Sequence, residues 1–433
     1  MSKKNNDSGF TVLAKLLKYT KPYTFYLVFT IVSAVISAIA TLYAPVLIGQ
    51  AVDFIIDINN VDFEKILPII IKLAGVGMLD LGFQDAGYEV VFVNEFKQEF
   101  MDSYCYARKN RNYNQPVYGY HVNDINYFLS GNGEHIFQQY IDHERQNNEL
   151  LGFIGGPPCP DFSIGGKNKG REGENGKLAK SYIDMICRFK PDFFLFENVK
   201  GLIKTQKHRE YFEELKSELI RNGYILSEQL MNSLDFGVPQ DRDRIFMIGV
   251  LKGTELARKV ISVNDTFAFP WNTNLPYDSE AVKKMNWPKP QKYREKSKRK
   301  FKYDVLKELT VEEWFRKNNV YRHSNRKDVF KVKGGKSKML TIQEGDTSRK
   351  SFKRLHRWKY SPTAAYGNNE VHLHPYRTRR LSVAEAMAIQ SLPAWFVLPT
   401  TVCLSAKFKM VGNGVPYLMS RKIAEKIRLF FGI

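Results

Sequence analysis

The chain has 433 residues, of which 43% are hydrophobic and 25% charged, and this composition excludes a disordered or low-complexity protein. Lys and Arg outnumber Asp and Glu by 65 to 45, and the resulting net charge of +20 favours a polyanionic partner or an anionic membrane surface. The four cysteines are widely spaced and form no C-x-x-C pair, so we expect neither a structural zinc site nor a disulfide framework. This cysteine content fits a reducing, intracellular setting.

Residues 1–68 predict an N-terminal hydrophobic helical segment. No residue from Pro22 to Val52 is charged, and this uncharged stretch is long enough to span a bilayer. We therefore predict a membrane contact through residues 22–56; the alternative is a buried hairpin or core helix. The stretches LLKYTKPY and APVLIGQAVDFII resemble the start of the transmembrane domain of ATP-binding-cassette exporters over residues 10–75. No phosphate loop of the form G-x-x-x-x-G-K-[ST] follows anywhere, which excludes a transporter for the whole chain.

From residue 69 onward, short apolar runs alternate with amphipathic segments such as Tyr211–Arg221, which we expect to be helical. This alternation predicts a mostly parallel sheet covered by helices on both faces, with ligands beyond the carboxyl ends of its strands. The predicted strands are Ile69–Leu73, Glu89–Val93, Gly152–Ile154, Phe193–Phe196 and Ile245–Val250.

Residues 283–360 differ in composition, since they contain 26 Lys and Arg against 8 Asp and Glu. Their hydrophobic periodicity is weak, but five large aromatic side chains can bury a small core. We interpret this stretch as a basic module inserted between two parts of the preceding domain. The aromatic residues are Trp287, Trp314, Phe315, Phe330 and Trp358.

Three groups of reactive residues follow predicted strands. Cys159 lies in GGPPC, where glycines permit a tight turn and prolines fix it, so the thiol is placed for reaction. Glu197 ends the strand at 193–196, where it is either an acid beside that loop or a helix cap. Arg242 and Arg244 are two residues apart and would point to one face, either toward one polar pocket or into an ion-pair ladder with the neighbouring aspartates.

A glycine pair, Gly75 and Gly77, follows the predicted strand at 69–73. Glu95 ends the next strand, 20 residues after Gly75, which is the spacing at which an acidic side chain meets ribose hydroxyls in nucleoside-binding βαβ units. The pattern therefore indicates a nucleoside site.

In this order, the blocks resemble the DNA (cytosine-5) methyltransferase family from about Ala74 to the C-terminus. The matching stretches are GGPPCPDFS, FENVKGL, QDRDR, RRLSVAEAMAIQSLP and GNGVP, with VNDI at 122–125 as a weaker match. The chain departs from the family at Pro160, which replaces a glutamine, and at Leu73 and Met78, which replace a phenylalanine and a glycine of the donor block.

The resemblance implies roles for individual residues. Cys159 would be the nucleophile that adds to carbon 6 of cytosine, Glu197 would contact ring nitrogen 3, and Arg242 and Arg244 would act around the cytosine and the loop. The implied methyl donor is S-adenosylmethionine, with no metal. The implied donor-binding residues are Ala74, Gly75, Gly77, Leu79, Glu95, Asp124, Ile125, Pro157, Asn413 and Val415.

The resemblance implies an α/β protein with a Rossmann-like S-adenosylmethionine-dependent methyltransferase sheet, an inserted basic target recognition domain and the N-terminal hydrophobic segment. The expected boundaries are 69–250 and 379–433 for the catalytic domain and 251–378 for target recognition. The implied function is methylation of cytosine in a specific sequence of duplex DNA by base flipping, in a restriction–modification system.

We expect a cytoplasmic monomer, with its N-terminal segment as a potential tether to the inner face of the membrane, and a cognate restriction endonuclease that acts separately. Two alternatives stay open: a catalytically impaired, membrane-tethered DNA-binding fusion protein, and an RNA cytosine-5 methyltransferase.

Overall fold

The computed structural model describes most of the chain after residue 68. Residues 66–433 form one compact unit. The predicted membrane-type segment, with the contact at 22–56, lies outside the described residues. No helix in the described part of the chain is long and apolar enough to cross a membrane. The described ranges are 69–74, 77–109, 111, 113–157, 174–261, 267–332, 335–349, 351–364, 366 and 372–433, with the backbone alone for 69–74, 174 and 175.

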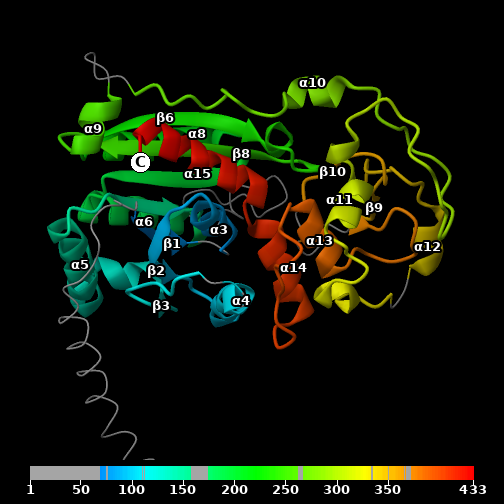
Figure 1. The fold of residues 1–433 in the computed structure, drawn as a ribbon, viewed down its shortest axis with the longest axis horizontal. Coiled ribbons are helices and arrows are strands. Elements are labelled where there is room, and N and C mark those ends of the chain that lie inside the picture. Colours follow the sequence, from blue (N-terminus) through cyan, green and yellow to red (C-terminus); the bar gives the residue numbers. More distant parts are fainter. Residues whose placement is uncertain are drawn as a thin grey trace, which may run out of the picture. The chain divides into compact units, whose positions relative to one another are not determined.

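A seven-stranded sheet forms the centre of the unit, in the order β3-β2-β1-β4-β5-β8-β6 (Figure 1). Each predicted strand is confirmed and slightly extended. The strands are β1 Ile69–Ala74, β2 Glu89–Asn94, β3 Tyr120–His121, β4 Leu151–Gly155, β5 Phe193–Val199, β6 Tyr224–Asn232 and β8 Asp243–Leu251.

The sheet is parallel from β3 to β5, and its direction then reverses at β8, which is antiparallel to both of its neighbours. This reversal brings the start of β8 to the edge where β5 ends. Strand β6 is not among the predicted strands, because its side chains are mostly half-buried and give no continuous apolar run.

Successive residues of β5 point to opposite faces of the sheet, and helices cover both faces. Phe194 and Phe196 pack with α5, α6 and α8, whereas Phe193 and Leu195 pack with α3 and α15. The C-terminal helix α15 therefore covers the same face as α3, the first described helix (Figure 1). The helices of the sheet region are α3 Met78–Asp85, α4 Gln98–Lys109, α5 Gly131–Gln146, α6 Glu174–Phe189, α7 Gly201–Lys204, α8 Gln206–Arg221, α9 Glu255–Val260 and α15 Tyr417–Phe431.

The basic stretch 283–360 contains little regular structure and shares its core with later residues. Phe315 is fully buried and packs with Leu381 and Ile389. A buried ion pair also links two residues of this stretch: Arg357 Nε lies 2.7 Å from Glu344 Oε1, and both side chains are almost fully buried. The elements in this part of the chain are α10 Ser279–Lys284, α11 Val311–Lys317, α12 Lys336–Thr341, α13 Val383–Ile389, α14 Leu404–Asn413, β7 Gln240–Asp241, β9 Lys353–Arg354, β10 Ser361–Pro362 and β11 His372–Leu373.

Candidate active site

Strand β4 ends at Gly155, four residues before Cys159 in the sequence. Cys159 itself lies outside the described residues, and the description stops at Pro157, which is buried. A Cβ atom on Gly156 would lie 2.6 Å from Oε2 of Glu197, closer than real Cβ contacts allow. Glycine at this position therefore lets the loop leave the sheet directly beside the Glu197 carboxyl group.

Glu197 lies near the end of β5 and is 7% exposed. Its Oε1 atom lies 2.8 Å from Nε of Arg244. Burial raises the pKa of Glu197, and the nearby Arg244 and Arg242 lower it only in part. Such a carboxyl group gains a proton more readily than an exposed one, and can donate that proton to a basic ring nitrogen.

Arg244 reaches Glu197 because of the strand reversal. In the β5–β8 register, Val199 pairs with Arg244 and Glu197 with Phe246. Glu197 and Arg244 are thus diagonal neighbours on one face of the sheet.

Arg242 is 1% exposed and has different partners from Arg244. Its Nη2 atom donates to the carbonyl oxygens of Gly412 (2.9 Å) and Gly414 (3.2 Å), and Nη1 donates to that of Ala364 (3.1 Å). Arg242 therefore donates to backbone carbonyl oxygens, whereas Arg244 pairs with Glu197, and both arginines lie close enough to Glu197 to lower its pKa. Arg242 thus fixes the backbone of the GNGVP block.

The alternative ion-pair ladder is also absent from the described residues. Asp243 lies 2.9 Å from the Nζ atom of Lys200, and Asp241 lies 3.5 Å from that of Lys283. Neither aspartate neutralises Arg242 or Arg244.

A glutamine pair, which sequence reasoning missed, strengthens the same junction. Gln240 Nε2 donates to Oε1 of Gln390 (2.9 Å), and Gln390 Nε2 donates to the carbonyl oxygens of Val411 and Gly414. Both glutamines are fully buried. They occur in two of the blocks already singled out, but their mutual contact has no signal in the sequence.

On the donor side, β1 ends at Ala74, and Gly75 lies outside the described residues. Gly77 precedes α3 in the left-handed conformation (φ 76°), and a Cβ atom there would lie 2.3 Å from the ring of Tyr104. This turn therefore requires glycine. Leu79 packs into the core between the sheet and α15, so its side chain points away from the turn.

The ends of β2 and β3 place two carboxylates at the same edge of the sheet. Glu95 directly follows β2, and Asp124 follows β3. Asn94 holds the two turns together, because its amide donates to the carbonyl of Asn123 (3.1 Å) and its oxygen accepts from the Asn123 N–H (3.2 Å). Asn94 was not singled out from the sequence.

Asp124 also caps a short helical turn by accepting from the N–H of Asn126 (2.9 Å), and the next residue, Ile125, is buried. Phe96, beside Glu95, is 67% exposed and offers a flat apolar surface. It is a further residue that the sequence analysis did not identify.

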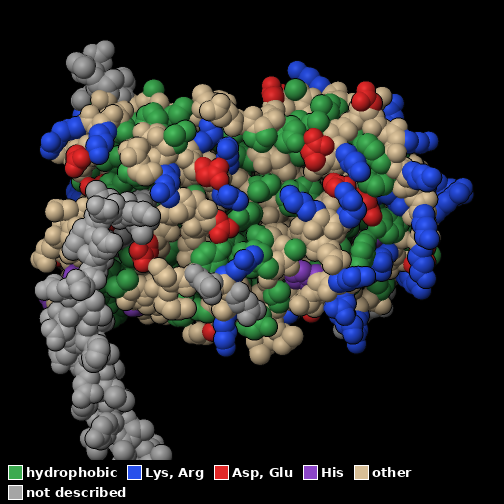
Figure 2. All heavy atoms as spheres, viewed as in Figure 1, with side chains coloured by type: hydrophobic (Ala, Val, Ile, Leu, Met, Phe, Trp, Pro, Cys, Tyr) green, Lys and Arg blue, Asp and Glu red, His purple; other side chains and the backbone are tan. Residues whose placement is uncertain are grey.

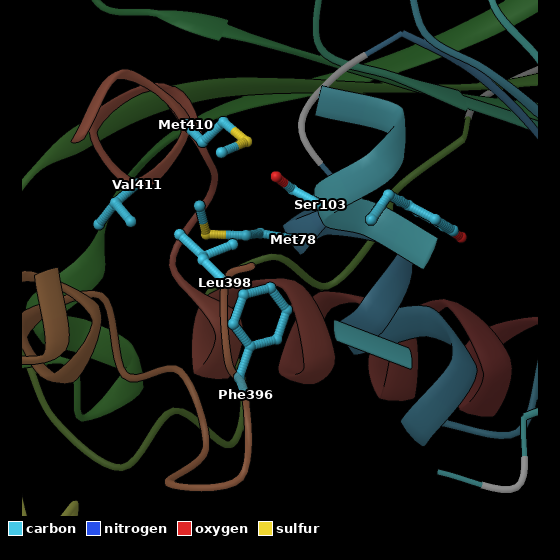
Figure 3. A pocket seen from close by; sticks show the side chains of 7 residues that line it. Met78, Ser103, Phe396, Leu398, Met410 and Val411 are labelled. Carbon is cyan, nitrogen blue, oxygen red and sulfur yellow. The ribbon is translucent and has the colours of Figure 1, made fainter. Parts of the chain in front are cut away.

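The closing block lies against the donor turn. Val415 is buried and Asn413, at the end of α14, is exposed. The Met78 side chain packs so closely on Gly414 that a Cβ atom there would lie 2.6 Å from Sδ of Met78. Met78 also lines a small pocket with Phe396, Leu398 and Met410, among others, and lies between Met410 and Phe396 in Figure 3. The methionine that departs from the resembled pattern therefore joins the donor turn to the C-terminal part of the chain.

The sequence model of the C-5 cytosine-specific DNA methylases matches residues 71–429. The chain belongs to the C-5 cytosine-specific DNA methylase family. It is thus a DNA (cytosine-5) methyltransferase, and its methyl donor is S-adenosylmethionine.

The relatives of this methyltransferase match most of its length. It is 45% identical over 375 residues to the Type II methyltransferase M.NmeDI of Neisseria meningitidis serogroup C, covering 87% of this chain and 86% of the relative. Identity to the Type II methyltransferase M.MthTI of Methanothermobacter thermautotrophicus is 27%, over 82% of this chain and 95% of the relative.

The fold is also similar to solved structures. A crystal structure of a DNA modification methyltransferase encoded within a prophage of E. coli matches with a TM-score of 0.55 and 21% identity, over 85% of this chain and 100% of that one. The predicted mixed α/β methyltransferase fold is therefore confirmed. None of these comparisons supports the exporter resemblance of residues 10–75.

The residues at the carboxyl edge suit the donor of this methyltransferase. S-adenosylmethionine carries a ribose, an adenine ring and no phosphate. Glu95 offers a carboxylate that suits hydroxyl groups, and Phe96 offers an exposed face that suits a flat ring.

Proposed function

We propose that this enzyme methylates carbon 5 of a cytosine flipped out of a specific duplex DNA sequence, with Cys159 as the nucleophile. The position of the Glu197 carboxyl group against Gly156, three residues before Cys159, carries this proposal. The Sγ atom of Cys159 adds to carbon 6, and Glu197 gives a proton to ring nitrogen 3. Carbon 5 thereby becomes nucleophilic enough to accept a methyl group.

Arg244 would hold the Glu197 carboxyl in place and present positive charge to the exocyclic oxygen of the cytosine. S-adenosylmethionine supplies the electrophilic methyl group. The demethylated donor, S-adenosylhomocysteine, would leave; the carbon-5 proton would pass to solvent, the Cys159 thiolate would be released, and the proton on ring nitrogen 3 would return to Glu197, which restores the aromatic ring. For the donor we propose the site formed by Ala74, Gly75 and Gly77 with the acids Glu95 and Asp124. The backbone at Leu79 and the residues Ile125, Pro157, Asn413 and Val415 would complete it.

Residues 251–378 are proposed as the target recognition domain, inserted between catalytic parts at 69–250 and 379–433. Figure 2 shows Lys and Arg side chains gathered at the end of the molecule where α12 lies in Figure 1. Within SKRKFKY, exposed residues alternate with half-buried ones. Phe301 packs on Trp358 at 5.3 Å between ring centroids. The exposed lysines at 298, 300 and 302 would then face phosphates.

The Type II methyltransferases among the relatives support a role as the modification arm of a restriction–modification system, with a separate endonuclease. We propose that the enzyme acts as a monomer in the cytoplasm, where its substrate DNA lies.

The uncharged stretch Pro22–Val52 supports a further proposal, a membrane contact through residues 22–56. The full chain should then sediment with membranes. Ile36→Lys combined with Ile39→Lys should release the chain to the supernatant without loss of methyl transfer. If the wild type and the double variant are found in the same fraction, whether membrane or supernatant, the membrane contact is refuted.

Bisulfite sequencing of DNA from cells that express the full chain tests the proposed activity and gives the recognition sequence. A duplex with that sequence and 5-fluorocytosine at the target should then form a denaturation-resistant complex, because the fluorine blocks loss of a carbon-5 proton. Cys159→Ala should abolish both results. A complex that survives this substitution would refute the role of Cys159, and transfer to tRNA in preference to duplex DNA would refute the proposed substrate.

A further inference from the structure

A buried arginine of α4 reaches the turn between β1 and α3. Arg108 is 4% exposed. Its Nη2 atom donates to the carbonyl oxygen of Gly77 (2.8 Å) and to Oδ2 of Asp80 (3.1 Å), while Nε donates to Oε1 of Gln84 (2.9 Å). One guanidinium group therefore binds the turn and the first two turns of α3 together.

Tyr104 completes this cluster from the same helix. Its hydroxyl donates to Oδ2 of Asp80 (2.5 Å), and the Arg108 guanidinium carbon lies 3.5 Å from the centre of its ring. The Tyr104 ring also closes the space beside Gly77, where a Cβ atom would collide with it. Arg108, Tyr104 and Asp80 thus each contact the other two.

Energetics favour a positioning role over a packing role. Burying Arg108 with Asp80 costs desolvation energy that a pair of apolar side chains would avoid. A charged donor on a carbonyl oxygen, however, fixes the direction of that peptide group more strictly than apolar contacts do. The Gly77 carbonyl belongs to the turn that approaches the donor.

We propose that Arg108, supported by Tyr104 and Asp80, is a positioning residue that fixes the Gly77 peptide for S-adenosylmethionine binding. This inference rests on the proposed donor site at Ala74–Gly77. Arg108 acts through the turn and does not contact the donor.

The opposite end of α3 supplies a matched control. Arg428 of α15 donates from Nη1 to the carbonyl oxygens of Ala86 (2.8 Å) and Gly87 (3.1 Å). It binds the same helix by the same type of bond, but at the end that lies away from the donor turn.

The test compares Arg108→Met, Arg108→Lys and Arg428→Met in the full chain, with calorimetric Kd for S-adenosylmethionine, KM for donor and DNA, kcat and the melting temperature. Arg108→Met should raise Kd and KM for the donor by about tenfold or more with little change in the KM for DNA. Arg108→Lys should recover part of this loss. Arg428→Met should lower the melting temperature alone.

Equal donor Kd values for wild type and Arg108→Met, or equal increases in Arg108→Met and Arg428→Met, would overturn the inference. If Arg108→Met fails to fold, Asp80→Asn with Tyr104→Phe tests the same support, and an unchanged donor Kd would again overturn it. If the proposed donor site is itself wrong, Glu95→Ala, in which Arg108 is intact, would leave the Kd for S-adenosylmethionine unchanged. This result separates a failure of the donor site from a failure of the positioning role of Arg108.

Discussion

The Nε atom of Arg244 lies 2.8 Å from Oε1 of Glu197, on two strands that run in opposite directions. One residue begins its strand and the other lies near the end of its strand, so only an antiparallel pair brings them to the same edge. The Glu197 carboxyl also lies where a Cβ atom on Gly156 would collide with it, at 2.6 Å from Oε2. This relationship links the blocks at 155, 197 and 244 in one site.

Glu197→Gln should lower kcat by about 10²- to 10⁴-fold, because the amide cannot give a proton to the cytosine ring. DNA affinity and the melting temperature should change little, since glutamine keeps the shape of the side chain. Single-turnover methyl transfer measures the effect. The control is Glu228→Gln on β6, which loses an ion pair with Lys216 of α8 and should keep full activity.

Arg242→Met and Arg244→Met should fail in different ways. Arg242→Met removes the hydrogen bonds to the buried carbonyl oxygens of Ala364 and Gly412 and one of the two to that of Gly414, so we expect the free energy of unfolding to fall by about 2–5 kcal/mol. Arg244→Met should mainly reduce kcat, and the pKa of Glu197 should rise further without its neighbour. Urea unfolding and methyl transfer on both variants test this division. Full stability of Arg242→Met would contradict the assigned positioning of the GNGVP block.

Replacing Lys298, Lys300 and Lys302 by glutamine should weaken DNA binding at every sequence and flatten its salt dependence. The slope of log K against log [salt] should become less steep by up to about 2.7, at about 0.9 for each phosphate that the variant no longer neutralises. Arg221→Gln is the control, because Arg221 is exposed at the end of α8, outside the proposed target recognition domain. Fluorescence anisotropy at several salt concentrations gives the slopes, which should be equal for the control and the wild type.

Acid should destabilise the basic module through its buried histidines. Burial lowers the pKa of His356 to about 4 and that of His372 to about 3, and it lowers the pKa of His374 as well. In the unfolded chain the same histidines gain a proton near pH 6.5, whereas in the folded chain they stay neutral to a lower pH. Their contribution to the free energy of unfolding is therefore complete above pH 6.5 and is lost as the pH falls toward 4. Each histidine contributes at most about 1.4 kcal/mol per pH unit in this window.

Melting temperatures between pH 7.5 and 4.5 test this expectation. His372→Phe should reduce the slope, because both ring nitrogens of His372 are buried without a hydrogen-bond partner among the described residues. The exposed His135 is the control, and His135→Gln should leave the slope unchanged. Equal slopes for His372→Phe and wild type would contradict the assignment.

Several features of the donor and nucleophile strands could be predicted from local patterns. The runs at 69, 89, 152, 193 and 245 are short, apolar and followed by polar residues, and each forms a strand of the central sheet. Glu197 and Glu95 were found because residues that end such strands share one edge of the sheet. The resemblance of the ordered blocks then indicated the family.

The sequence alone therefore determined five of the seven strands of the sheet, the order of the blocks and the family. The tertiary structure decided which residues contact each other. Arg244 meets Glu197 because β8 is reversed, and Arg242 binds the carbonyl oxygens of residues 364, 412 and 414. Arg108 holds the Gly77 carbonyl from a different helix. The hydrophobic pattern of a strand depends on residues that are near each other in the chain, so it can be recognised in the sequence. The contacts of Arg244, Arg242 and Arg108 join residues that are far apart in the chain, and they follow from strand direction and packing.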